Sequence, residues 1–522
     1  MVIKQDMRIY KRTFCLFFVF LFFSKISISQ IWEKKYGLPY LTEFCNSSTT
    51  TYDNGLLLAN RINNQSALWL LKTDRNGQAL YSHTIGIQGY TFFSGSTIET
   101  NNGGIITSGG YALLGSGGWS YPNIISIDNC GNLLWCKYIP LEGYSYRIKE
   151  SRPGNYVLHT RYASNNFPIE RNQLWGIDST GKINWFNQIV PEDEVPFNGT
   201  EINDFALTSD NGFLLSGYCY YPDPQNPGWD RLQYLLVKTD SIGNAEWIQP
   251  NGLDTNNIGA LYSCIQHGNA YYSVGFWYGP VDTIVPPCLN KYDLNGNLIY
   301  SSILHSDTLN NMLVDVDVLN DSTLAMVGKC THGYFDWIYM GVFTADTSGN
   351  LLRSMQNENG SPLEECLSIS MDEKIFCTGL TPIGYSSPWD AFAIKLNANL
   401  EYDSIYTQPF TYDSLCPYPI VSDTILCNCE PFVSVKEAKE AQQSLSIMPN
   451  PATDGFTVGF ENVFQQVGTL RVYDVLGRIQ TEEVLPPGQK QTKISSGSWK
   501  PGLYLVRYQS GGKVMSGKVL IR

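Results

Sequence analysis

The side chains that could carry out acid–base, nucleophilic or metal chemistry are dispersed along this 522-residue sequence. The five histidines are His83, His159, His267, His305 and His332, and no two of them have the spacing of metal ligands. The sequence contains no G-x-S-x-G elbow, no H-E-x-x-H and no glycine-rich phosphate-binding loop. We therefore predict no catalytic residues, no metal and no cofactor, although residues from distant segments could still assemble in the fold.

Acidic residues that are close together in the sequence offer a weaker possibility of catalysis. Glu192 and Glu194 form one pair, Asp315 and Asp317 form another, and Asp390 precedes an apolar run. A glycosidase or lyase would need two carboxylates, or a tyrosine and a histidine, to converge. Because nothing in the spacing brings such groups together, we interpret these residues as parts of solvated loops, strand edges or a strand start.

The sequence has thirteen cysteines, of which twelve lie outside the N-terminal leader described below. An even number of cysteines in an exported protein permits disulfides. Cys366 and Cys377 flank an expected hairpin and form the first candidate pair, and Cys416 with Cys427 or Cys429 forms the second. One residue separates Cys427 from Cys429, whereas a zinc knuckle has two, so we do not predict a metal site there.

Aromatic residues gather in five segments rich in glycine and proline, and these are our candidate ligand-binding residues. They are Trp119, Tyr121, Tyr220, Tyr221, Trp229, Trp277, Tyr278, Tyr334, Phe335, Trp337, Tyr385 and Trp389. Exposed rings among small polar residues provide rigid apolar contact and adaptable hydrogen bonds, which suits a polysaccharide or a surface protein. The alternative is that the rings fill gaps between structural elements and cover the core.

The elements that would position these residues are copies of one hairpin, as in YLLVKTDSIGNAEW (234–247) and WLLKTDRNGQALY (69–81). The turn glycines, 50 to 62 residues apart, are Gly77, Gly131, Gly181, Gly243, Gly296 and Gly349, and AIKLNANLEY (393–402) is a seventh copy without the glycine. In each D-x-x-G turn the aspartate can bind backbone N–H groups, and the glycine accepts the left-handed conformation of a bulged hairpin. The copy DLNGN (293–297) is weakly similar to a calcium loop but lacks the later acidic ligands, so we interpret it as a structural turn.

A second turn recurs upstream of each hairpin, as in YDNGLLLAN and SDNGFLLSGY, and alternating apolar and small residues follow it. One period therefore contains four antiparallel strands, which make one blade of a propeller. Seven copies predict an all-β fold with a seven-bladed β-propeller. The first and third turns of each blade are short and share one face, whereas the aromatic second connections and the crossings between blades share the opposite face, here called the loop face.

The segment IWEKKYG (31–37) has the pattern of an outer strand without its preceding hairpin. We expect it to complete the last blade, with Trp32 packed against residues 391–396. Residues 400–410 could occupy the same place, so the sequence leaves both closures open.

The N-terminus and the composition predict an exported protein. Basic residues precede the apolar run FCLFFVFLFF (14–23), and Ser27 and Ser29 follow it, which is typical of a secretory signal peptide over residues 1–29. The run is shorter than the roughly 20 residues that span a bilayer, so we expect no transmembrane segment in the mature chain. The formal charge is −13, or about −17 without residues 1–29, which argues against a nucleic-acid partner because phosphate binding requires clusters of lysine and arginine.

The composition changes after the propeller, which we place at residues 30–430. Residues 431–444 indicate a polar linker, and residues 445–522 indicate a small β domain with nine basic and five acidic residues. The ordered motifs of this domain are Pro449-Asn450-Pro451, Val472-Tyr473-Asp474 with Gly477-Arg478, Pro501-Gly502-Leu503-Tyr504-Leu505-Val506, and a basic terminus with Lys518 and Arg522.

The order of these motifs resembles the type A C-terminal sorting domain of type IX secretion cargo from Bacteroidetes, and the repeats are similar to the propeller regions that such cargo carries. Met448 departs from the pattern, because the family usually has an aromatic residue there. The resemblance implies an immunoglobulin-like β-sandwich, transit through the periplasm, recognition by the type IX machinery and removal of the domain. The product would be released or attached to the cell surface. The alternative is a β-sandwich module for stability or adhesion.

We predict from these observations a secreted or cell-surface propeller that binds a glycan or protein ligand through its aromatic loop face and has no enzymatic activity. Two alternatives stay open, a polysaccharide-degrading hydrolase or lyase and a structural component of the cell surface.

Overall fold

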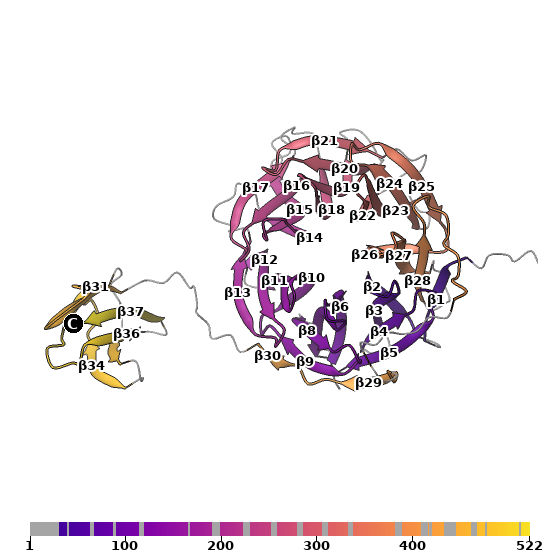
Figure 1. Cartoon of the computed structure of the whole chain (residues 1–522). Helices are drawn as coiled ribbons and strands as arrows, with labels where there is room; N and C mark the ends of the chain where they lie inside the picture. The colour runs from indigo at the N-terminus through magenta and orange to yellow at the C-terminus, as the bar shows by residue number, and fades with distance from the viewer. Residues whose placement is uncertain are drawn as a thin grey trace, which may run out of the picture. The chain divides into compact units, whose positions relative to one another are not determined.

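The computed structural model describes residues 31–522 with short internal gaps. The gaps are 39–40, 63–66, 87–89, 114–119, 165–166, 190–198, 223–229, 252–257, 279–285, 305–311, 332–337, 382–388, 409–415, 417–419, 433–444, 461–466, 475–477 and 511–512. The expected leader and most of the expected linker therefore lie outside the described residues. The chain divides into two compact units, Met1–Phe432 and Val433–Arg522, and every regular element in the described residues is a β-strand (Figure 1).

The first unit consists of seven four-stranded antiparallel blades arranged in a ring, with the first strand of each blade nearest the centre (Figure 1). Blade 1 contains β2 (Glu43–Thr50), β3 (Leu56–Ile62), β4 (Ala67–Thr73) and β5 (Ala79–Gly86). Blade 2 contains β6 (Tyr90–Glu99), β7 (Ile105–Leu113), β8 (Tyr121–Ile127) and β9 (Leu133–Tyr138). Blade 3 contains β10 (Gly143–Arg152), β11 (Asn155–Ser164), β12 (Phe167–Asp178) and β13 (Ile183–Gln188).

The remaining four blades repeat this arrangement. Blade 4 contains β14 (Thr200–Leu207), β15 (Phe213–Pro222), β16 (Asp230–Thr239) and β17 (Ala245–Asn251). Blade 5 contains β18 (Ile258–His267), β19 (Ala270–Tyr278), β20 (Pro287–Tyr292) and β21 (Leu298–Ile303). Blade 6 contains β22 (Met312–Asn320), β23 (Thr323–Cys330), β24 (Tyr339–Asp346) and β25 (Leu351–Asn357). Blade 7 contains β26 (Ser361–Ile369), β27 (Ile375–Leu380), β28 (Ala391–Leu396) and β1 (Glu33–Tyr36), which confirms the predicted seven-bladed propeller.

Burial within a blade explains the two sequence patterns of its strands. β4 is buried at every position, because neighbouring blades cover both of its faces, and its sequence is a nearly continuous apolar run. β5 lies at the outer edge and alternates between buried and more exposed residues. The apolar runs and the alternating runs of each period therefore correspond to inner and outer strands of one blade.

The ring closes through the N-terminal strand, as the sequence predicts. β1 pairs antiparallel with β28, and Trp32 is fully buried with its ring edge against Phe376, at 5.3 Å between centroids. The indole N–H of Trp32 donates to the carbonyl of Arg75 at 2.8 Å. Residues 402–404 begin to pair next to β28, but the backbone N–H of Trp32 binds the carbonyl of Asp403, and β1 continues the blade from there.

The aspartates of the D-x-x-G turns bind backbone, as predicted. Asp293 Oδ1 accepts hydrogen bonds from the N–H groups of Asn295 and Asn297, both at 2.9 Å, and Gly296 has a φ of 82°. In the seventh copy Leu400 adopts the left-handed conformation with a φ of 61°, and Asn397 takes the place of the aspartate. The DLNGN segment is therefore a turn stabilised by its own side chain.

The aromatic residue four positions after a turn glycine couples several blades to the next. A Cβ at Gly243 would lie 3.0 Å from the indole of Trp185, and one at Gly296 would lie 2.8 Å from that of Trp247. Trp135 also donates its indole N–H to the carbonyl of Ser179 at 2.9 Å. At these positions the glycine lets the turn rest on the aromatic ring of the preceding blade.

After blade 7 the chain follows the outside of blades 1 and 2 as a segment that we call the strap, residues 403–432. Its strands β29 (Asp423–Leu426) and β30 (Glu430–Pro431) pair in parallel with β5 and β9, at the outer edge of the ring (Figure 1). Phe432 is buried against blade 2, so the first unit extends two residues beyond the expected boundary at residue 430.

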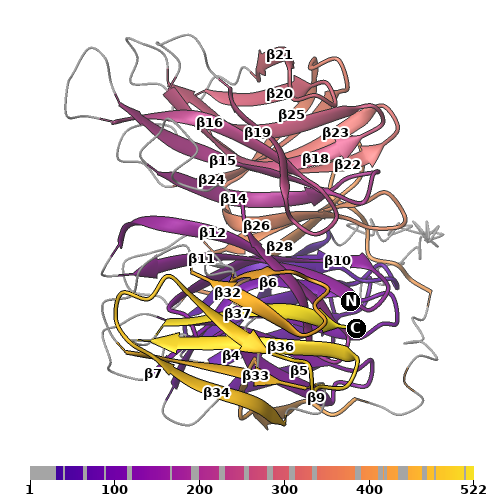
Figure 2. The ribbon, with the colours of Figure 1, turned by 90° about the vertical axis from the view of Figure 1, so that its left-hand side faces the viewer.

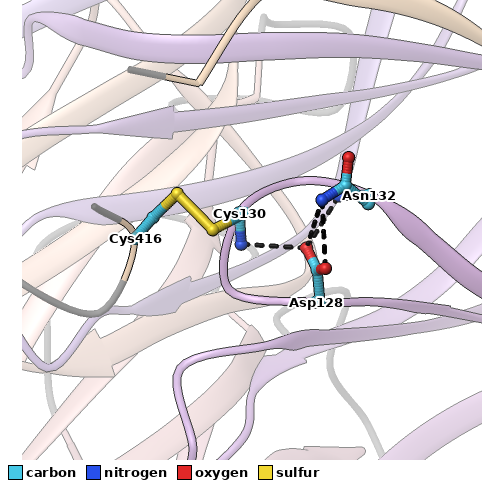
Figure 3. Close-up of a disulfide and its surroundings, with 4 residues drawn as sticks. All are labelled: Asp128, Cys130, Asn132 and Cys416. Atoms are coloured by element: carbon cyan, nitrogen blue, oxygen red, sulfur yellow. Dashed lines mark hydrogen bonds between the residues drawn. A yellow bond between two sulfur atoms is a disulfide. The ribbon is translucent and has the colours of Figure 1, made fainter. Parts of the chain in front are cut away.

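Two disulfides join the strap to blade 2 and correct the expected pairing. Cys416 bonds to Cys130, which lies in the turn held by Asp128 (Figure 3), and Cys429 bonds to Cys136 in β9. Cysteines about 290 residues apart in the sequence come together because the strap returns to blade 2 after the ring has closed, and local spacing carries no sign of this.

The other candidate cysteines, Cys366, Cys377 and Cys427, are buried thiols. Burial raises the pKa of all three. In the sheet the residue opposite Cys377 is Leu367 rather than Cys366, so the expected pair is wrong because the hairpin register does not place the two cysteines opposite each other.

The second unit is a β-sandwich. One sheet contains β31 (Ser446–Met448), β32 (Gly455–Gly459) and β35 (Gln491–Ser495). The other contains β34 (Ile479–Leu485), β33 (Gly468–Tyr473), β36 (Gly502–Ser510) and β37 (Lys513–Ile521). Side chains alternate between the core and solvent along β36, and residues such as Phe456, Val472 and Val506 form the core between the sheets. This agrees with the small immunoglobulin-like domain that the sequence predicts.

Candidate functional site

Most of the candidate aromatic residues on the loop face lie outside the part of the chain whose side chains the structure describes. Trp119, Trp229, Tyr334, Phe335, Trp337 and Tyr385 fall in the gaps, and Tyr221, Trp277 and Tyr278 are described only as backbone at the ends of β15 and β19. The described side chains are those of Tyr121, Tyr220 and Trp389, and all three are half-buried.

All three rings pack edge-on against a neighbouring aromatic residue. The distances between centroids are 6.0 Å for Tyr121 and Tyr138, 4.9 Å for Trp389 and Phe44, and 5.7 Å for Tyr220 and Tyr218. This packing agrees with the alternative role that the sequence left open.

Tyr220 also belongs to a polar cluster where blades 3 and 4 meet at the loop face. We call it the Arg161 cluster; its members are Tyr146, Arg161, Glu201, Tyr218 and Tyr220. The strands that carry it, β10, β11, β14 and β15, are neighbours in the ring (Figures 1 and 2). β12, which pairs with β11, has 12 residues and is the longest described strand of the chain.

A bidentate ion pair between Arg161 and Glu201 lies at the centre of the Arg161 cluster. Arg161 Nη2 lies 2.7 Å from Glu201 Oε1, and Arg161 Nη1 lies 2.8 Å from Glu201 Oε2. The Tyr220 hydroxyl donates to Glu201 Oε1 at 3.2 Å, and Arg161 Nη1 lies 3.5 Å from the Tyr146 hydroxyl. The side chains of Arg161 and Glu201 are 16% and 18% exposed, so the pair is partly accessible. This pairing is strong because two charge-assisted bonds act in parallel.

Two tyrosines of the cluster have raised pKa values. Burial raises the pKa of Tyr218, and its hydrogen bond and charge interaction with Glu201 raise it further. Burial and Glu201 also raise the pKa of Tyr220. These two hydroxyls are therefore suited to donating hydrogen bonds to a ligand.

A ring of polar residues surrounds the central channel one level below the loop face. β2, β6, β10, β14, β18 and β22 each have a β-bulge at the same height. The residues that follow the bulge are Ser47, Ser96, Arg147, Asp204, Ser263 and Asp315. A bulge re-aims a side chain, and here it directs side chains to the next blade.

Side chains of this ring bind the neighbouring blade. Ser47 Oγ accepts a bond from the backbone N–H of Thr97 at 2.8 Å. Asp204 Oδ2 accepts bonds from the Ser263 hydroxyl at 2.8 Å and the Cys264 N–H at 3.4 Å. The ring therefore holds adjacent inner strands together around the channel.

Asp315 completes a carboxylate pair across Ser263. Its Oδ1 lies 3.0 Å from Ser263 Oγ, and its Oδ2 accepts the backbone N–H groups of Cys366 and Leu367 at 3.2 and 3.1 Å. The interpretation of Asp315 as a solvated strand-edge residue is wrong, because the bulge turns it into the ring, where it is 9% exposed.

Two cations lie next to Asp204, and a third aspartate, Asp317, follows Asp315 on β22. Arg147 Nε and Lys149 Nζ each lie 3.4 Å from Asp204 Oδ1. Burial raises the pKa of Asp204, but Lys149, Arg147 and the Ser263 hydrogen bond outweigh burial, so this pKa lies below its ordinary value. Burial raises the pKa of Asp317 above its ordinary value. The pKa values of these two aspartates are thus shifted in opposite directions.

The remaining candidates for chemistry do not converge in the described residues. His159 is fully buried beside Asn172, with 3.2 Å between His159 Nε2 and Asn172 Oδ1, and burial lowers its pKa to about 4. His267 Nε2 lies 2.8 Å from the carbonyl of Asp321, and Asp390 directly precedes β28, which agrees with a strand-start residue. Four candidates lie outside the described residues, and they are His305, His332, Glu192 and Glu194.

One group of potential metal ligands occurs in the described residues. The sulfur atoms of Cys136, Cys427 and Cys429 lie within 4.8 Å of one another. Because Cys136 and Cys429 form a disulfide, their sulfurs are not available as thiolates.

In the second unit the motif residues lie around one groove of about 580 Å³. Asp474, Tyr504 and Lys518 line it together with Tyr473, Leu503, Leu505 and Arg507. In the sheet Tyr473 is opposite Leu505, and Leu505 is opposite Lys518, which places the three residues in one row.

Hydrogen bonds connect the other motif residues to this groove. Asn450 donates from Nδ2 to the carbonyl of Lys518 at 2.8 Å and accepts the Leu520 N–H at 2.9 Å. Asp474 Oδ2 binds Arg478 Nη2 and Nε at 2.7 and 2.8 Å. Pro449 and Pro451 flank Asn450 and are exposed, Gly502 begins β36, and Gly477 lies outside the described residues. Motifs spread over about 70 residues of sequence therefore meet on β33, β36 and β37.

Comparison with known proteins supports the assignment of the second unit. Residues 446–522 match the family model described as "secretion system C-terminal sorting domain". The match shows a sorting domain of the type IX secretion system, which implies recognition by that machinery and a secreted or cell-surface location. No described helix is long and apolar enough to cross a membrane.

The solved structures that resemble the chain share little sequence with it. The crystal structure of polysaccharide lyase Uly1 has a TM-score of 0.44 and 10% identity, and the match covers 68% of this chain and 90% of Uly1. The β-propeller domain of the Trilobed protease from Pyrococcus furiosus has a TM-score of 0.37 and 11% identity, covering 60% and 83%. Phage phi92 endosialidase has a TM-score of 0.38 and 10% identity, covering 94% and 87%. The comparison with curated protein sequences yields no match.

Proposed function

We propose that this protein is a binding or adhesion propeller that the type IX system exports and that contacts a glycan or protein ligand through its loop face. The Arg161 cluster carries the proposal, because it combines three tyrosines with an accessible Arg–Glu pair at the face that also bears the aromatic connections. Aromatic rings with nearby hydroxyl and charged groups give apolar contact and directional hydrogen bonds to the same ligand.

The channel carboxylates support binding rather than catalysis. Asp204 and Asp315 bind backbone N–H groups and side chains of adjacent blades, and their oxygens are engaged in holding the blades together. A general acid or base must instead be free to exchange a proton with the substrate.

A test of the loop face uses the mature chain, residues 30–522, and a panel of soluble polysaccharides. Binding is measured by calorimetry, and each mixture is assayed for new reducing ends and unsaturated products. We expect saturable binding without new products. Tyr220→Ala should weaken it by about tenfold or more, since it removes an aromatic contact and a hydroxyl. Tyr300→Ala, which changes a half-buried tyrosine of β21 on an outer strand, is the matched control.

Three outcomes would count against this proposal. Binding that Tyr220→Ala and Tyr300→Ala affect equally would show that the Arg161 cluster is not the site. If no polysaccharide binds, a glycan ligand is excluded for the panel tested, and a protein ligand or a structural role at the cell surface is favoured. New reducing ends would replace the binding function with an enzymatic one.

The enzymatic alternative rests on the opposite pKa shifts of Asp204 and Asp317 in one channel. A glycosidase needs two carboxyl groups of different acidity, one as general acid and one as nucleophile or base. If new reducing ends appear, Asp317→Asn should abolish them and leave polysaccharide binding intact. Activity that survives this change would exclude Asp317 as the acid.

We also propose that the groove of the second unit is the surface that the type IX machinery recognises, in a Bacteroidetes protein whose residues 1–29 are removed on export. Its mixture of Tyr473, Leu505 and Lys518 offers apolar contact next to a positive charge. Lys518→Glu should reduce the secreted fraction in cells, whereas Lys493→Glu, on the other sheet, should not. Equal secretion of both variants would contradict this assignment.

A further inference from the structure

Buried lysines occupy the same position in the third strand of several blades, towards the face opposite the loop face. In blade 1, Lys72 is 1% exposed, and its Nζ lies 2.7 Å from Glu99 Oε1 of blade 2 and 3.9 Å from Asp53 Oδ2. In blade 4, Lys238 pairs with Asp210 at 2.7 Å and with Glu246 at 3.1 Å. We call such a buried lysine with its carboxylates a lysine plug.

Blade 7 has the same device. Lys395 is fully buried, and its Nζ lies 3.5 Å from Asp403 Oδ2 and 3.7 Å from Asp372 Oδ2. A buried ammonium group needs such partners, because an unpaired buried charge costs several kcal/mol (~3–5). Of these three lysines Lys72 reaches a carboxylate of the next blade, whereas Lys238 and Lys395 pair with carboxylates of their own blade or of the segment that follows it.

Three blades lack the lysine: blade 2 has Ser126 at this position, blade 6 has Thr344, and blade 3 has the smallest residue, a glycine. Gly176 stands at the lysine position, since Gly176 is opposite Trp185 as Lys72 is opposite Tyr81 and Lys238 is opposite Trp247. A Cβ at Gly176 would overlap Nε1 of Trp185, so the indole lies directly on the glycine.

The acidic partner is missing as well. Leu207 ends β14 directly before the turn residue Thr208, as Glu99 ends β6 directly before Thr100. The first turn of blade 3 reads Arg-Pro-Gly-Asn and carries no carboxylate in place of Asp53. Both charges of the plug are therefore absent at the junction of blades 3 and 4.

A pocket of about 300 Å³ occupies this junction. Its lining includes Gly176 and Leu207, the two residues that replace the plug. The volume is at the lower end of the range for small-ligand sites, about 300–1,000 Å³. Leu207 and Ile242, which also line it, are 39% and 45% exposed, so the pocket opens to solvent.

The lining combines an apolar wall, several amide groups and one cation. Trp185 and Phe213, whose rings stack with 6.0 Å between centroids, form an apolar wall. Asn155, Asn184 and Asn211 provide amide groups, and Arg152 is the one charged residue of the described lining. A lining with a cation and no carboxylate contrasts with the formal charge of −13 of the whole chain. The nearby Asp210 carboxylate is neutralised by Lys238 at 2.7 Å.

We infer that this pocket binds one anionic sugar residue, such as a hexuronate, on the face opposite the Arg161 cluster. The apolar wall suits the C–H face of a pyranose ring, the amides suit its hydroxyls, and Arg152 suits a carboxylate, to which guanidinium groups bind with charge-assisted hydrogen bonds. This site does not depend on the function proposed for the loop face.

The test uses the mature full chain and calorimetric titration with oligosaccharides of glucuronic and galacturonic acid. The neutral oligosaccharides of glucose and galactose serve as comparison ligands, and acetate serves as a simple anion. We expect saturable binding of the uronates and binding of the neutral sugars that is about tenfold weaker or more. Arg152→Ala should remove this preference, and Asn184→Ala should weaken both classes of sugar.

Matched controls separate the pocket from general effects. Lys182→Ala removes an exposed cation of blade 3 outside the lining, and Leu134→Ala changes the position in blade 2 that corresponds to Asn184; both should leave binding unchanged. Tyr220→Ala should also leave it unchanged, so loss of the loop-face function and loss of this site are distinguishable. Denaturation midpoints equal to that of the unmodified protein show that the variants are folded.

Four results would overturn the inference. They are no saturable binding of any sugar, uronate binding that Arg152→Ala and Asn184→Ala leave unchanged, equal affinity for neutral and acidic sugars, and acetate binding as strong as uronate binding.

Discussion

The two disulfides of the strap should stabilise the propeller in a non-additive way. Cys130–Cys416 and Cys136–Cys429 join residues 286 and 293 positions apart. A single cross-link over a loop of this length reduces the entropy of the unfolded chain by an amount worth about 5.5 kcal/mol, extrapolated from about 4.7 kcal/mol for 100 residues. When one disulfide is present, the other closes only the short path of roughly 20 residues between the two bonds, which is worth about 3 kcal/mol.

Alanine replacement of one pair should therefore lower the free energy of unfolding by about 3 kcal/mol, whichever pair is removed. Removal of both pairs should lower it by about 8–9 kcal/mol, well above twice the single effect. The assay is equilibrium unfolding in guanidinium chloride without reductant, followed by tryptophan fluorescence, and Cys219→Ala supplies the control for loss of a buried sulfur atom.

Two results would refute this reasoning. A double variant that loses no more than either single variant would mean that the strap detaches before the blades unfold, so the disulfides do not constrain the ring. The free energy of unfolding of the double variant could instead fall by the sum of two small single effects. This would mean that packing of the strap, rather than loop closure, determines how much the disulfides stabilise the propeller.

Three further predictions concern single residues. Gly296→Ala should destabilise by about 2 kcal/mol in urea unfolding, because its φ of 82° is unfavourable for alanine and its Cβ would lie 2.8 Å from an indole. Gly488→Ala, with a φ of 87° and open space around it, should cost about 1 kcal/mol, and equal costs would contradict this account. Lys395→Met should cost about 3 kcal/mol or less, since it removes the cation beside Asp372 while Lys374 remains 3.6 Å from Asp403, and a neutral effect would show that the plug is dispensable. Burial lowers the pKa of His159 from 6.5 to about 4, so the unfolded chain binds its proton first as the pH falls. Stability should therefore drop by about 3 kcal/mol between pH 6.5 and 4, and His159→Gln should flatten this slope.

The sequence predicts the parts of the fold that local pattern determines. Gly77 to Gly349 mark the third turn of each blade because a left-handed turn needs glycine, and the outer-strand pattern around Trp32 predicts the closure. Leu400 shows the limit of this argument, since burial in the core between blades 6 and 7 keeps a leucine in a conformation that favours glycine.

The parts that the sequence does not predict depend on contacts between distant segments. The bulges that turn Asp204 and Asp315 into the channel depend on the register between strands, and nothing in their spacing distinguishes them from exposed acidic residues. The disulfides depend on the path of the strap around the finished ring. The pocket at Gly176 depends on how one position of the repeat varies between blades. Aligning the seven copies would have shown a glycine here, where blades 1, 4, 5 and 7 have lysine and blades 2 and 6 have Ser126 and Thr344.

The strap also determines how the propeller responds to a mechanical load. When force is applied to the chain after Phe432, Cys429 is the first covalently cross-linked residue that it reaches. The disulfide to Cys136 transmits this force to β9. Cys416 and Cys130 share the load in the same blade. The pairing of β1 with β28, which closes the ring without a covalent bond, lies outside this path. A force on the C-terminal side of the propeller therefore enters the ring through blade 2 and not through the β1–β28 pairing, and cleavage after residue 432 leaves both disulfides in place.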